Sequence, residues 1–243
     1  MEEKTMTDPN LSANGLMAFW ARIDADYLMT FQQWHNCEHV PERVAIPGFL
    51  RGRRYRDLSG DAFFLMFYET RDTATLGSSA YMAALNSPTR WTKEALSHFK
   101  EPARNIYSLV REWGGSGVNA APYLVTMRFN LSADENESKQ SALQNNWLNA
   151  VSAISGIRRV RFYEVDEAIT RIATSERKIY GDGPGAQQYL VFIEGDVPVS
   201  EWLDQVEGCL LTSTQTADPR KNLRSDLFWL EFGYLKQNEE AGK

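Results

Sequence analysis

The chain has 243 residues, of which 43% are hydrophobic, 12% aromatic and 24% charged. This is the composition of an ordinary globular protein, and it argues against disorder, a collagen-like repeat and a long coiled coil. The 26 Lys and Arg against 32 Asp and Glu give a formal net charge of −6, so the basic surface of a nucleic-acid-binding protein is not expected.

The sequence shows no signal for a membrane, for export or for disulfides. Its longest apolar stretches, such as residues 62–68, are far shorter than the roughly 20 residues of a membrane helix. No hydrophobic signal core lies in the N-terminal stretch MEEKTMTDPN, and Cys37 and Cys209 belong to no CxxC motif. We therefore expect a cytoplasmic protein whose partners are small molecules or other protein chains, with no nucleic acid and no membrane.

Taken in chain order, the first half predicts strand, helix, strand, strand, helix, strand. We place the strands near residues 16–23, 49–57, 62–69 and 105–112, and the helices near 25–40 and 78–99. Ser87 and Pro88 are typical of an N-cap and a first helical residue, so the second helix is expected in two pieces. Pro41 is expected to kink the first helix.

The second half repeats this order after a predicted hinge at the GGSG stretch, residues 114–117, and the AAP stretch, residues 120–122. Its strands are placed near residues 122–130, 157–165, 188–194 and 225–235, and its helices near 136–153 and 199–212.

An internal repeat connects the two halves. The stretch IPGFLRGRRY (46–55) resembles ISGIRRVRFY (154–163) at an offset of 108, measured from Gly48 to Gly156. Farther on, FLMFYE (64–69) matches YLVFIE (189–194) at an offset of 125. The second copy therefore carries an insertion, residues 171–187, which we interpret as a long mobile loop because of its Gly-Asp-Gly-Pro-Gly run.

This order of elements is the ferredoxin-like split βαβ arrangement, and it places the chain in the α+β class. The apolar run at 63–67 suits a sheet covered by helices on one face and by another sheet on the other. The expected organisation is a flexible N-terminus, a first ferredoxin-like unit, a second degenerate unit that contains the 171–187 loop, and a flexible C-terminus. Their bounds are 1–14, 15–116, 117–238 and 239–243.

Several motifs of the first half belong together. They are WHNCEHVPER (34–43), PGF (47–49), RRY (53–55), SAY (79–81) and NSPTRW (86–91). In this combination the sequence resembles the dimeric α/β-barrel (EthD-like) superfamily over most of residues 15–112, whereas the second half matches only in its strand layout.

The resemblance implies two ferredoxin-like units whose sheets face each other to enclose a pocket. Here one chain would supply both units as an intrachain pseudo-dimer, and further association into a homodimer stays open. Known chemistry in this superfamily includes lactone isomerases, polyketide cyclases, cofactor-free monooxygenases, haem-degrading oxygenases and chlorite-dismutase-like haem enzymes. The fold alone does not choose among them.

The candidate catalytic residues are His35, Glu38 and His39. In a regular helix Glu38 falls inside the apolar stripe and the two histidines fall along its edge. A carboxylate that faces an apolar sheet has a raised pKa, and a neighbouring histidine titrates near neutrality, so the group is suited to exchange protons with a substrate. The alternative is a structural salt bridge from Glu38 to an arginine such as Arg43 or Arg54.

The repeat predicts a single site per chain. At the offset of 108 the three candidates map onto Leu143, Asn146 and Trp147, and the second half has no histidine at all. The second unit would then act as a wall and lid, although simple drift of the second copy would give the same asymmetry. His35 and His39 have the spacing of a metal-binding pair, but no Cys or Asp cluster joins them, and we expect no metal site.

Aromatic side chains from different elements are expected to bind the substrate together with one arginine. The candidate substrate-binding residues are Trp34, Arg54, Tyr55, Phe64, Tyr68 and Trp91. Alternation along the strand puts Arg51 and Arg53 on one face and Arg54 on the other. Arg54 then either meets a substrate carboxylate or enolate oxygen, or pairs with Glu38 or Glu69.

These residues favour a cofactor-independent lyase, isomerase or cyclase that acts by acid–base chemistry on a small aromatic or polyketide-like substrate. The first alternative is an oxygenase, either cofactor-free or haem-dependent with His35 or His39 as the axial ligand. The second is a non-catalytic protein that binds a hydrophobic metabolite. No cofactor is expected under the favoured hypothesis.

Overall fold

The protein folds around one closed barrel of antiparallel strands. The computed structural model describes residues 13–114, 121–130, 146–181, 184–213 and 223–236. The strands are β1 (Gly15–Ile23), β2 (Phe49–Asp57), β3 (Phe63–Thr70), β4 (Phe99–Gly114), β5 (Tyr123–Phe129), β6 (Ile157–Val165), β7 (Tyr189–Gly195) and β8 (Arg224–Leu235). They pair in the order β1-β3-β2-β8-β5-β7-β6-β4, which closes on itself.

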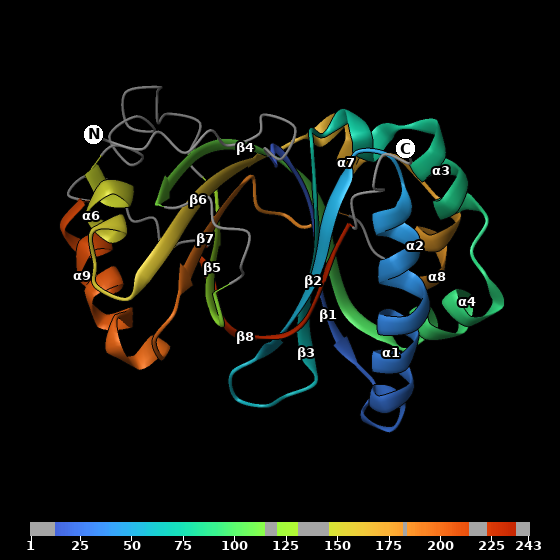
Figure 1. Ribbon diagram of the computed structural model, residues 1–243, viewed down its shortest axis with the longest axis horizontal. Coiled ribbons are helices and arrows are strands. Elements are labelled where there is room, and N and C mark those ends of the chain that lie inside the picture. Colours follow the sequence, from blue (N-terminus) through green and yellow to red (C-terminus); the bar gives the residue numbers. More distant parts are fainter. Residues whose placement is uncertain (1–12, 115–120, 131–145, 182–183, 214–222, 237–243) are drawn as a thin grey trace, which may run out of the picture.

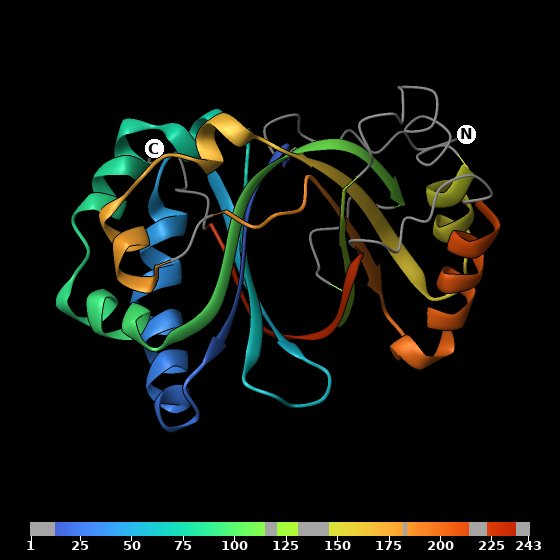
Figure 2. The same ribbon diagram turned by 180° about the vertical axis from the view of Figure 1, so that it is seen from behind.

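The barrel consists of two ferredoxin-like sheets. The first half contributes β4-β1-β3-β2 and the second contributes β8-β5-β7-β6, joined where β2 pairs with β8 and β4 with β6. The helices lie outside in two groups (Figures 1 and 2). The predicted α+β pseudo-dimer of two tandem ferredoxin-like units is thereby confirmed.

One group of helices covers the first sheet and the other covers the second. The first comprises α1 (Leu28–Trp34), a π-helical turn (His35–His39), α2 (Val40–Ala45), α3 (Ser79–Asn86) and α4 (Arg90–Ser97), with short 3-10 turns at Ala25–Tyr27 and Ala74–Gly77. The second comprises α6 (Leu148–Ser152) and α9 (Leu203–Ser213), with a 3-10 turn at Val199–Glu201. Within the described residues, no helix combines the length and apolar character needed to cross a membrane.

The first helix differs from the prediction because it passes through Pro41 and ends at Ala45. A proline inside a helix lacks the amide hydrogen and crowds the preceding turn. The chain accommodates it with the π-helical turn His35–His39 directly before α2, since a π turn is wider than an α turn. The helix thus continues through Pro41 with a local change of helix type.

The second helix is divided, as predicted. α3 ends at Asn86, and α4 starts after Thr89, whose side chain accepts a hydrogen bond from the amide of Thr92. The N-cap is thus Thr89 and not Ser87. The strand that follows begins at Phe99, earlier than the predicted residue 105.

The insertion of the second half is not simply a loop. Residues 166–181, which we call the crossing segment, contain α7 (Glu167–Thr170) and α8 (Ser175–Tyr180). α8 is capped by the Thr174 hydroxyl, which accepts from the amide of Arg177. Both figures place α7 and α8 beside the helices of the first unit and away from α6 and α9. The prediction of a long loop over 171–187 is therefore wrong for the part that forms α8.

Some predicted features lie outside the described residues. They are the two chain ends, the hinge at 115–120 and the start of the predicted helix 136–153. The described part of that helix is α6.

The repeat is visible in the backbone. Gly48 and Gly156, which the sequence aligns, both have φ of +89°. A Cβ at Gly48 would lie 2.7 Å from the side chain of Thr75, and one at Gly156 would lie 2.4 Å from that of Val197. Both copies therefore need glycine at this turn, for its left-handed conformation and for space.

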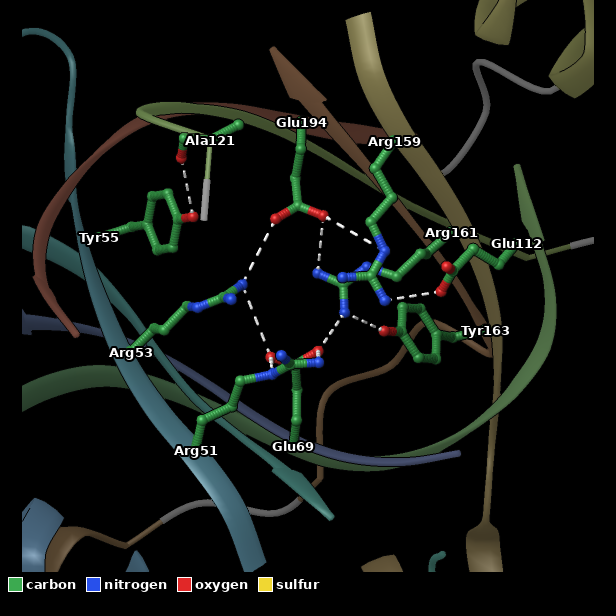
Figure 3. Close-up of polar contacts among 10 residues, drawn as sticks. All are labelled: Arg51, Arg53, Tyr55, Glu69, Glu112, Ala121, Arg159, Arg161, Tyr163 and Glu194. Atoms are coloured by element: carbon green, nitrogen blue, oxygen red, sulfur yellow. Dashed lines mark hydrogen bonds and ion pairs between the residues drawn. The ribbon is translucent and has the colours of Figure 1, made fainter. Parts of the chain in front are cut away.

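The barrel interior holds a pseudo-symmetric ring of charges (Figure 3). Arg161 contacts Glu69 at 2.6 Å and Glu194 at 3.0 Å, while Arg53 lies 3.5 Å from Glu69 and 3.4 Å from Glu194. The repeat offsets relate Arg53 to Arg161 and Glu69 to Glu194. Each arginine thus joins the carboxylates of both units, and the ring ties the two halves together at the centre of the barrel.

Two further arginines extend the ring. Arg51 pairs with Glu69 at 2.6 Å, and its counterpart Arg159 pairs with Glu112 at 2.6 Å. Burial alone would raise the pKa of Glu69, but Arg161, Arg53 and Arg51 together hold it well below its usual value. Glu69 is therefore ionised at neutral pH in spite of its complete burial.

Apolar side chains fill the rest of the interior between the sheets. They include Leu16, Ala18, Trp20, Leu65, Phe67, Leu124, Leu190, Phe192 and Phe228. The described barrel interior is thus a packed core. The pocket that we describe below lies on the outer face of the first sheet, and not between the facing sheets as the resemblance implies.

Candidate active site

The candidate site lies between the outer face of the first sheet and the helices that cover it. Its lining comes from β1, β3 and β4, from the helix spanning α1 to α2, from α3 and α4, and from the crossing segment. The lining residues are Met17, Phe19, Trp34, His35, His39, Arg43, Met66, Tyr68, Tyr81, Leu85, Leu96, Phe99, Arg104, Thr174, Glu176 and Tyr180. One ferredoxin-like unit therefore forms the pocket, and the other unit's insertion closes it.

The pocket is narrow and largely apolar. The cavity between these side chains has a volume of about 20 Å³. The space therefore consists of slots between side chains, with room for one or two water molecules. A ligand as large as an aromatic ring requires the lining side chains to move.

The π-helical turn determines which of its residues face this pocket. An α-helix rotates by about 100° per residue, and the wider π turn rotates by less. After three residues Glu38 has consequently turned away from the apolar stripe, and it is only half-buried. Its carboxylate accepts hydrogen bonds from Thr89 at 2.6 Å and Thr92 at 3.1 Å, at the start of α4. His35 and His39 remain on the pocket side and are buried.

His35 is held by an arginine that the second unit in turn positions. Arg54 Nη1 lies 3.1 Å from His35 Nδ1, and Arg54 Nε donates to Glu231 of β8 at 2.5 Å. A guanidinium group can only donate, so Nδ1 accepts and the proton of the neutral ring lies on Nε2. Burial, assisted by the charge of Arg54, lowers the pKa of His35 well below its ordinary value, and the ring is neutral at pH 7.

His39 is a second neutral imidazole. Its ring centre lies 4.4 Å from that of Trp34 and 5.9 Å from that of His35. Burial, with the charge of Arg43, lowers the pKa of His39 well below the ordinary value. Its Nδ1 atom is buried without a hydrogen-bond partner in the described chain.

The most unusual ionisable group of the pocket is Glu176, on α8. Its carboxylate pairs with Nη2 of Arg43, which is buried at the C-terminal end of the helix. Burial raises the pKa of Glu176 to about 7, because the loss of hydration outweighs the attraction of Arg43 and Arg104. Glu176 therefore exchanges its proton close to neutral pH.

Tyr68 contributes a phenol to the sheet side of the pocket. Burial raises its pKa well above the ordinary value, so the hydroxyl keeps its proton at neutral pH. That hydroxyl has no hydrogen-bond partner in the described chain, and neither do Nε and Nη1 of Arg43. Three buried donor groups thus stand at the pocket without an acceptor, whereas buried polar groups in proteins are usually paired.

The structure brings four of the predicted site residues to the pocket, namely Trp34, His35, His39 and Tyr68. The other five lie outside its lining. Glu38 caps α4, and Arg54 stands behind His35. Tyr55 points into the barrel and donates to the carbonyl of Ala121 (Figure 3), Phe64 packs against Phe31 at 5.1 Å, and Trp91 packs at the edge of the core.

Sequence reasoning missed Glu176 and Arg104, and considered Arg43 only as a salt-bridge partner. The insertion itself was the available signal for Glu176, since an extra segment in one copy of a repeat often carries function. Nothing local to the sequence indicates that this segment crosses to the other unit.

The second unit differs from the first at the position that corresponds to His39. At the position of His39 the repeat has Trp147, which is fully buried and packs among Leu148, Val151 and Trp202. A large indole thus occupies the space that the first unit leaves to its imidazoles. The asymmetry that the sequence predicts is present in the packing of the described residues.

A possible metal-binding group lies elsewhere. Within the described chain, Asp24, Asp26 and His98 have ligand atoms within 4.8 Å of one another. Asp24 is already engaged, however, by His98 at 3.1 Å and by Lys100 at 3.6 Å. A lysine beside the carboxylate competes with a cation, and this cluster is not part of the pocket.

Comparisons with known proteins agree with this fold. No family model matches the chain, and no curated protein matches it. An anthrone oxidase-like protein matches in structure with a TM-score of 0.63 and 7% identity, over 93% of this chain and 94% of that one. A protein of Fusobacterium nucleatum named "Putative monooxygenase" matches with a TM-score of 0.59 and 9% identity, over 92% and 95%.

A third match is a mutant chlorite dismutase from Candidatus Nitrospira defluvii. It has a TM-score of 0.54 and 12% identity, and the match covers 92% of this chain and 95% of that one. At such low identities the matches establish architecture only. The chain has the dimeric α/β-barrel fold, with both ferredoxin-like units in a single polypeptide.

Proposed function

We propose that this chain is a cofactor-independent enzyme that moves a proton on a small aromatic or polyketide-like substrate in the pocket beneath α8. The observation that carries the proposal is Glu176, a carboxyl group with a pKa of about 7 among aromatic and apolar side chains. A general acid or base works best when its pKa lies near the working pH, and perturbed groups of this kind concentrate at active sites.

The proposed first step is proton removal from a carbon next to a carbonyl group. Glu176 accepts the proton, and the electron pair of the C–H bond moves to the carbonyl oxygen to form an enolate. The hydroxyl of Tyr68 and the unpaired N–H groups of Arg43 stabilise that oxygen. Return of that proton from Glu176 to a different atom of the enolate completes an isomerisation. Departure of a leaving group from the neighbouring carbon, which takes the proton, completes a lyase reaction, and attack of the enolate carbon on a second carbonyl group, whose oxygen takes the proton, completes a cyclisation. His39 and His35 stand at the pocket as neutral imidazoles.

This assignment replaces Glu38 by Glu176 as the acid–base carboxylate. Glu38 lies outside the pocket lining and is engaged by two threonines. The motif at 34–43 that resembles EthD-like proteins nevertheless supplies three residues of the pocket lining, His35, His39 and Arg43. We therefore interpret the motif as part of the active site.

A cofactor-free oxygenase is the second candidate. It is favoured by the names of two structural neighbours, an anthrone oxidase-like protein and a "Putative monooxygenase". The same carbanion would add O₂ and a proton to give a hydroperoxide, which loses water to leave a new carbonyl group. Both candidates begin with the same proton transfer, and they differ in what the carbanion meets next.

Haem does not fit the described pocket. An axial histidine needs a free ring nitrogen with open space for the macrocycle in front of it. Because His35 Nδ1 accepts from Arg54, its Nε2 carries the proton and has no lone pair for iron, and the ring of His39 is packed by Trp34 at 4.4 Å and Tyr68 at 6.3 Å between ring centres. We therefore propose no step through haem.

The test is hydrogen–deuterium exchange at carbon. The enzyme is incubated in D₂O with planar aromatic ketones, for example 1-tetralone and anthrone, and with any ligand that mass spectrometry identifies in the denatured protein. Glu176→Gln should lower the rate of deuterium uptake by roughly 10²–10⁴-fold, the usual effect of losing a general base. Matched measurements of oxygen consumption distinguish the oxygenase from the isomerase. Recovery of unchanged, unexchanged ligand would support a binding protein instead.

A further inference from the structure

The closed pocket is too small for the substrate class proposed above. Its cavity has a volume of about 20 Å³, whereas a protein cavity that takes up benzene measures about 150 Å³. An aromatic ring therefore enters only if one wall of the pocket moves outward. The walls are the first sheet, the helices of the first unit, and Thr174, Glu176 and Tyr180 of the crossing segment.

Two of these walls are parts of the core. The strands β1, β3 and β4 belong to the closed barrel, in which each pairs with a neighbour on both sides. The helix from α1 to α2 buries Phe31, Trp34 and Val44, and α3 and α4 bury Leu85 and Leu96 in the same core. Displacing either wall exposes this apolar surface to water, so neither wall is suited to open.

The third wall, α8, is held more weakly. The buried residue of α8 is the charged Glu176, whereas Ile179 and Tyr180 are only partly buried against the core of the first unit. An exposed contact adds to this attachment, because the amide of Ser175 donates to the side-chain oxygen of Asn86 at 3.0 Å, and the Ser175 hydroxyl donates to it at 3.4 Å. Segments with few buried apolar contacts and exposed hydrogen bonds are those that open locally.

The two ends of this wall are suited to a pivot. Before it, Thr170 is fixed to β4, because its hydroxyl accepts from the amide of Ile106 at 2.9 Å and donates to the carbonyl of Ile106 at 3.2 Å. The next residues, 171–173, are exposed. Arg177 ties α8 to the fixed end by donating to the carbonyl of Thr170 at 2.8 Å. After α8, Gly181 has φ of +75°, and nothing in the described chain lies within 4 Å of a Cβ built there.

We propose that residues 171–181, which we call the lid, swing away from the first unit to admit a substrate and then close over it, with residues 166–170 as the fixed base. Closure returns Glu176 to its contact with Arg43, so it brings the proposed base to the substrate, and it excludes water from the pocket. The inference rests on the proposed function for the purpose of this motion, whereas the motion itself is measured without a substrate.

The experiment measures how often the pocket opens in the free, full-length protein. A cysteine is introduced at one of two neighbouring buried positions of β3, which face opposite sides of the sheet. Met66→Cys places the thiol in the pocket, and Leu65→Cys places it in the barrel interior. Both proteins also carry Cys37→Ser and Cys209→Ser. The probe is 4,4′-dithiodipyridine, a neutral aromatic disulfide that reacts with a thiol only when it reaches it.

We expect Met66→Cys to react at least about tenfold faster than Leu65→Cys, because opening of the lid requires less free energy than opening of the barrel. Val151→Ala, which leaves a cavity in the core of the second unit, lowers the stability of the whole chain. It should therefore speed the reaction of Leu65→Cys and leave that of Met66→Cys unchanged.

Two variants and a control assign the opening to the lid. Asn86→Ala removes the acceptor of the Ser175 bonds, and Arg177→Met removes the bond to the carbonyl of Thr170. Each should speed the reaction of Met66→Cys by roughly 3–10-fold, the effect of losing one hydrogen bond of the closed lid. Arg171→Lys, in the same segment but 70% exposed, should leave the reaction unchanged. Hydrogen exchange by mass spectrometry repeats the comparison without new thiols, and the amides of α8 should exchange faster than those of α4.

Equal reaction rates of Met66→Cys and Leu65→Cys would overturn the proposal, since the pocket would then open only with the barrel. So would a reaction of Met66→Cys that neither Asn86→Ala nor Arg177→Met changes, because a different wall would then move. No substrate is present in these measurements. An opening lid without deuterium exchange at carbon would therefore refute the proposed function and leave this inference standing, and the reverse result would do the opposite.

Discussion

Replacing Glu69 by Gln removes the most heavily paired carboxylate of the barrel interior. Glu69 lies within 3.5 Å of Arg51, Arg53 and Arg161, and it is completely buried. The isosteric amide leaves Arg53 and Arg161 with Glu194 as their remaining carboxylate, and it removes the carboxylate that pairs with Arg51. Breaking a buried ion pair on one side costs about 3–5 kcal/mol, because the remaining charge is uncompensated. For a chain of this size such a loss lowers the melting temperature by about 10 °C.

The same variant should change the response to acid. The folded-state pKa of Glu69 is depressed, so the carboxylate contributes stability above its unfolded pKa of about 4.3, and this contribution is lost as the pH falls toward the folded value. Uptake of one proton on unfolding changes the free energy of unfolding by at most about 1.4 kcal/mol per pH unit. The wild-type protein should therefore lose stability below about pH 4 more steeply than Glu69→Gln.

Urea denaturation followed by tryptophan fluorescence at several pH values measures both effects. Glu167→Gln is the matched control, because Glu167 forms an exposed i,i+4 pair with Arg171 and should cost less than about 0.5 kcal/mol. If Glu69→Gln unfolds at the same urea concentration as the wild type, the charge ring does not hold the two units together as the structure implies.

Two further predictions concern the pocket. Nitrogen-15 NMR should find the His35 ring neutral between about pH 5 and pH 8 with its proton on Nε2, because Arg54 donates to Nδ1; a proton on Nδ1 would contradict the Arg54 contact. Glu38→Gln should destabilise the protein by about 1 kcal/mol through weaker bonds from Thr89 and Thr92, with deuterium exchange unchanged. Loss of exchange in that variant would return Glu38 to the catalytic role.

The sequence predicted the strands well because the two copies support each other. The match of residues 46–55 with 154–163 supports the predicted strands at 49–57 and 157–165, which are the observed bounds of β2 and β6, and it aligns Gly48 with Gly156, which share a φ of +89°. Alternation also separated Arg51 and Arg53, which enter the charge ring, from Arg54 on the helix side. These are local or periodic properties, which a sequence records directly.

The candidate site was predicted only in part, for two physical reasons. The helical projection assumed a regular α-helix, and the π turn before Pro41 rotated Glu38 out of the stripe. The carboxylate that we propose as the base, Glu176, is 133 residues away from its partner Arg43 in the chain. Contacts at that separation depend on how the insertion crosses between units, and no periodicity within either half encodes this crossing.

The dependence of deuterium exchange on pH tests the central claim most directly. For a substrate or analogue that exchanges in the wild-type protein, the rate should rise with pH through an apparent pKa near 7 as Glu176 loses its proton. In Glu176→Gln the rate should be low and without that step. A step near pH 7 that persists at full amplitude in Glu176→Gln would contradict the assignment of Glu176 as the base.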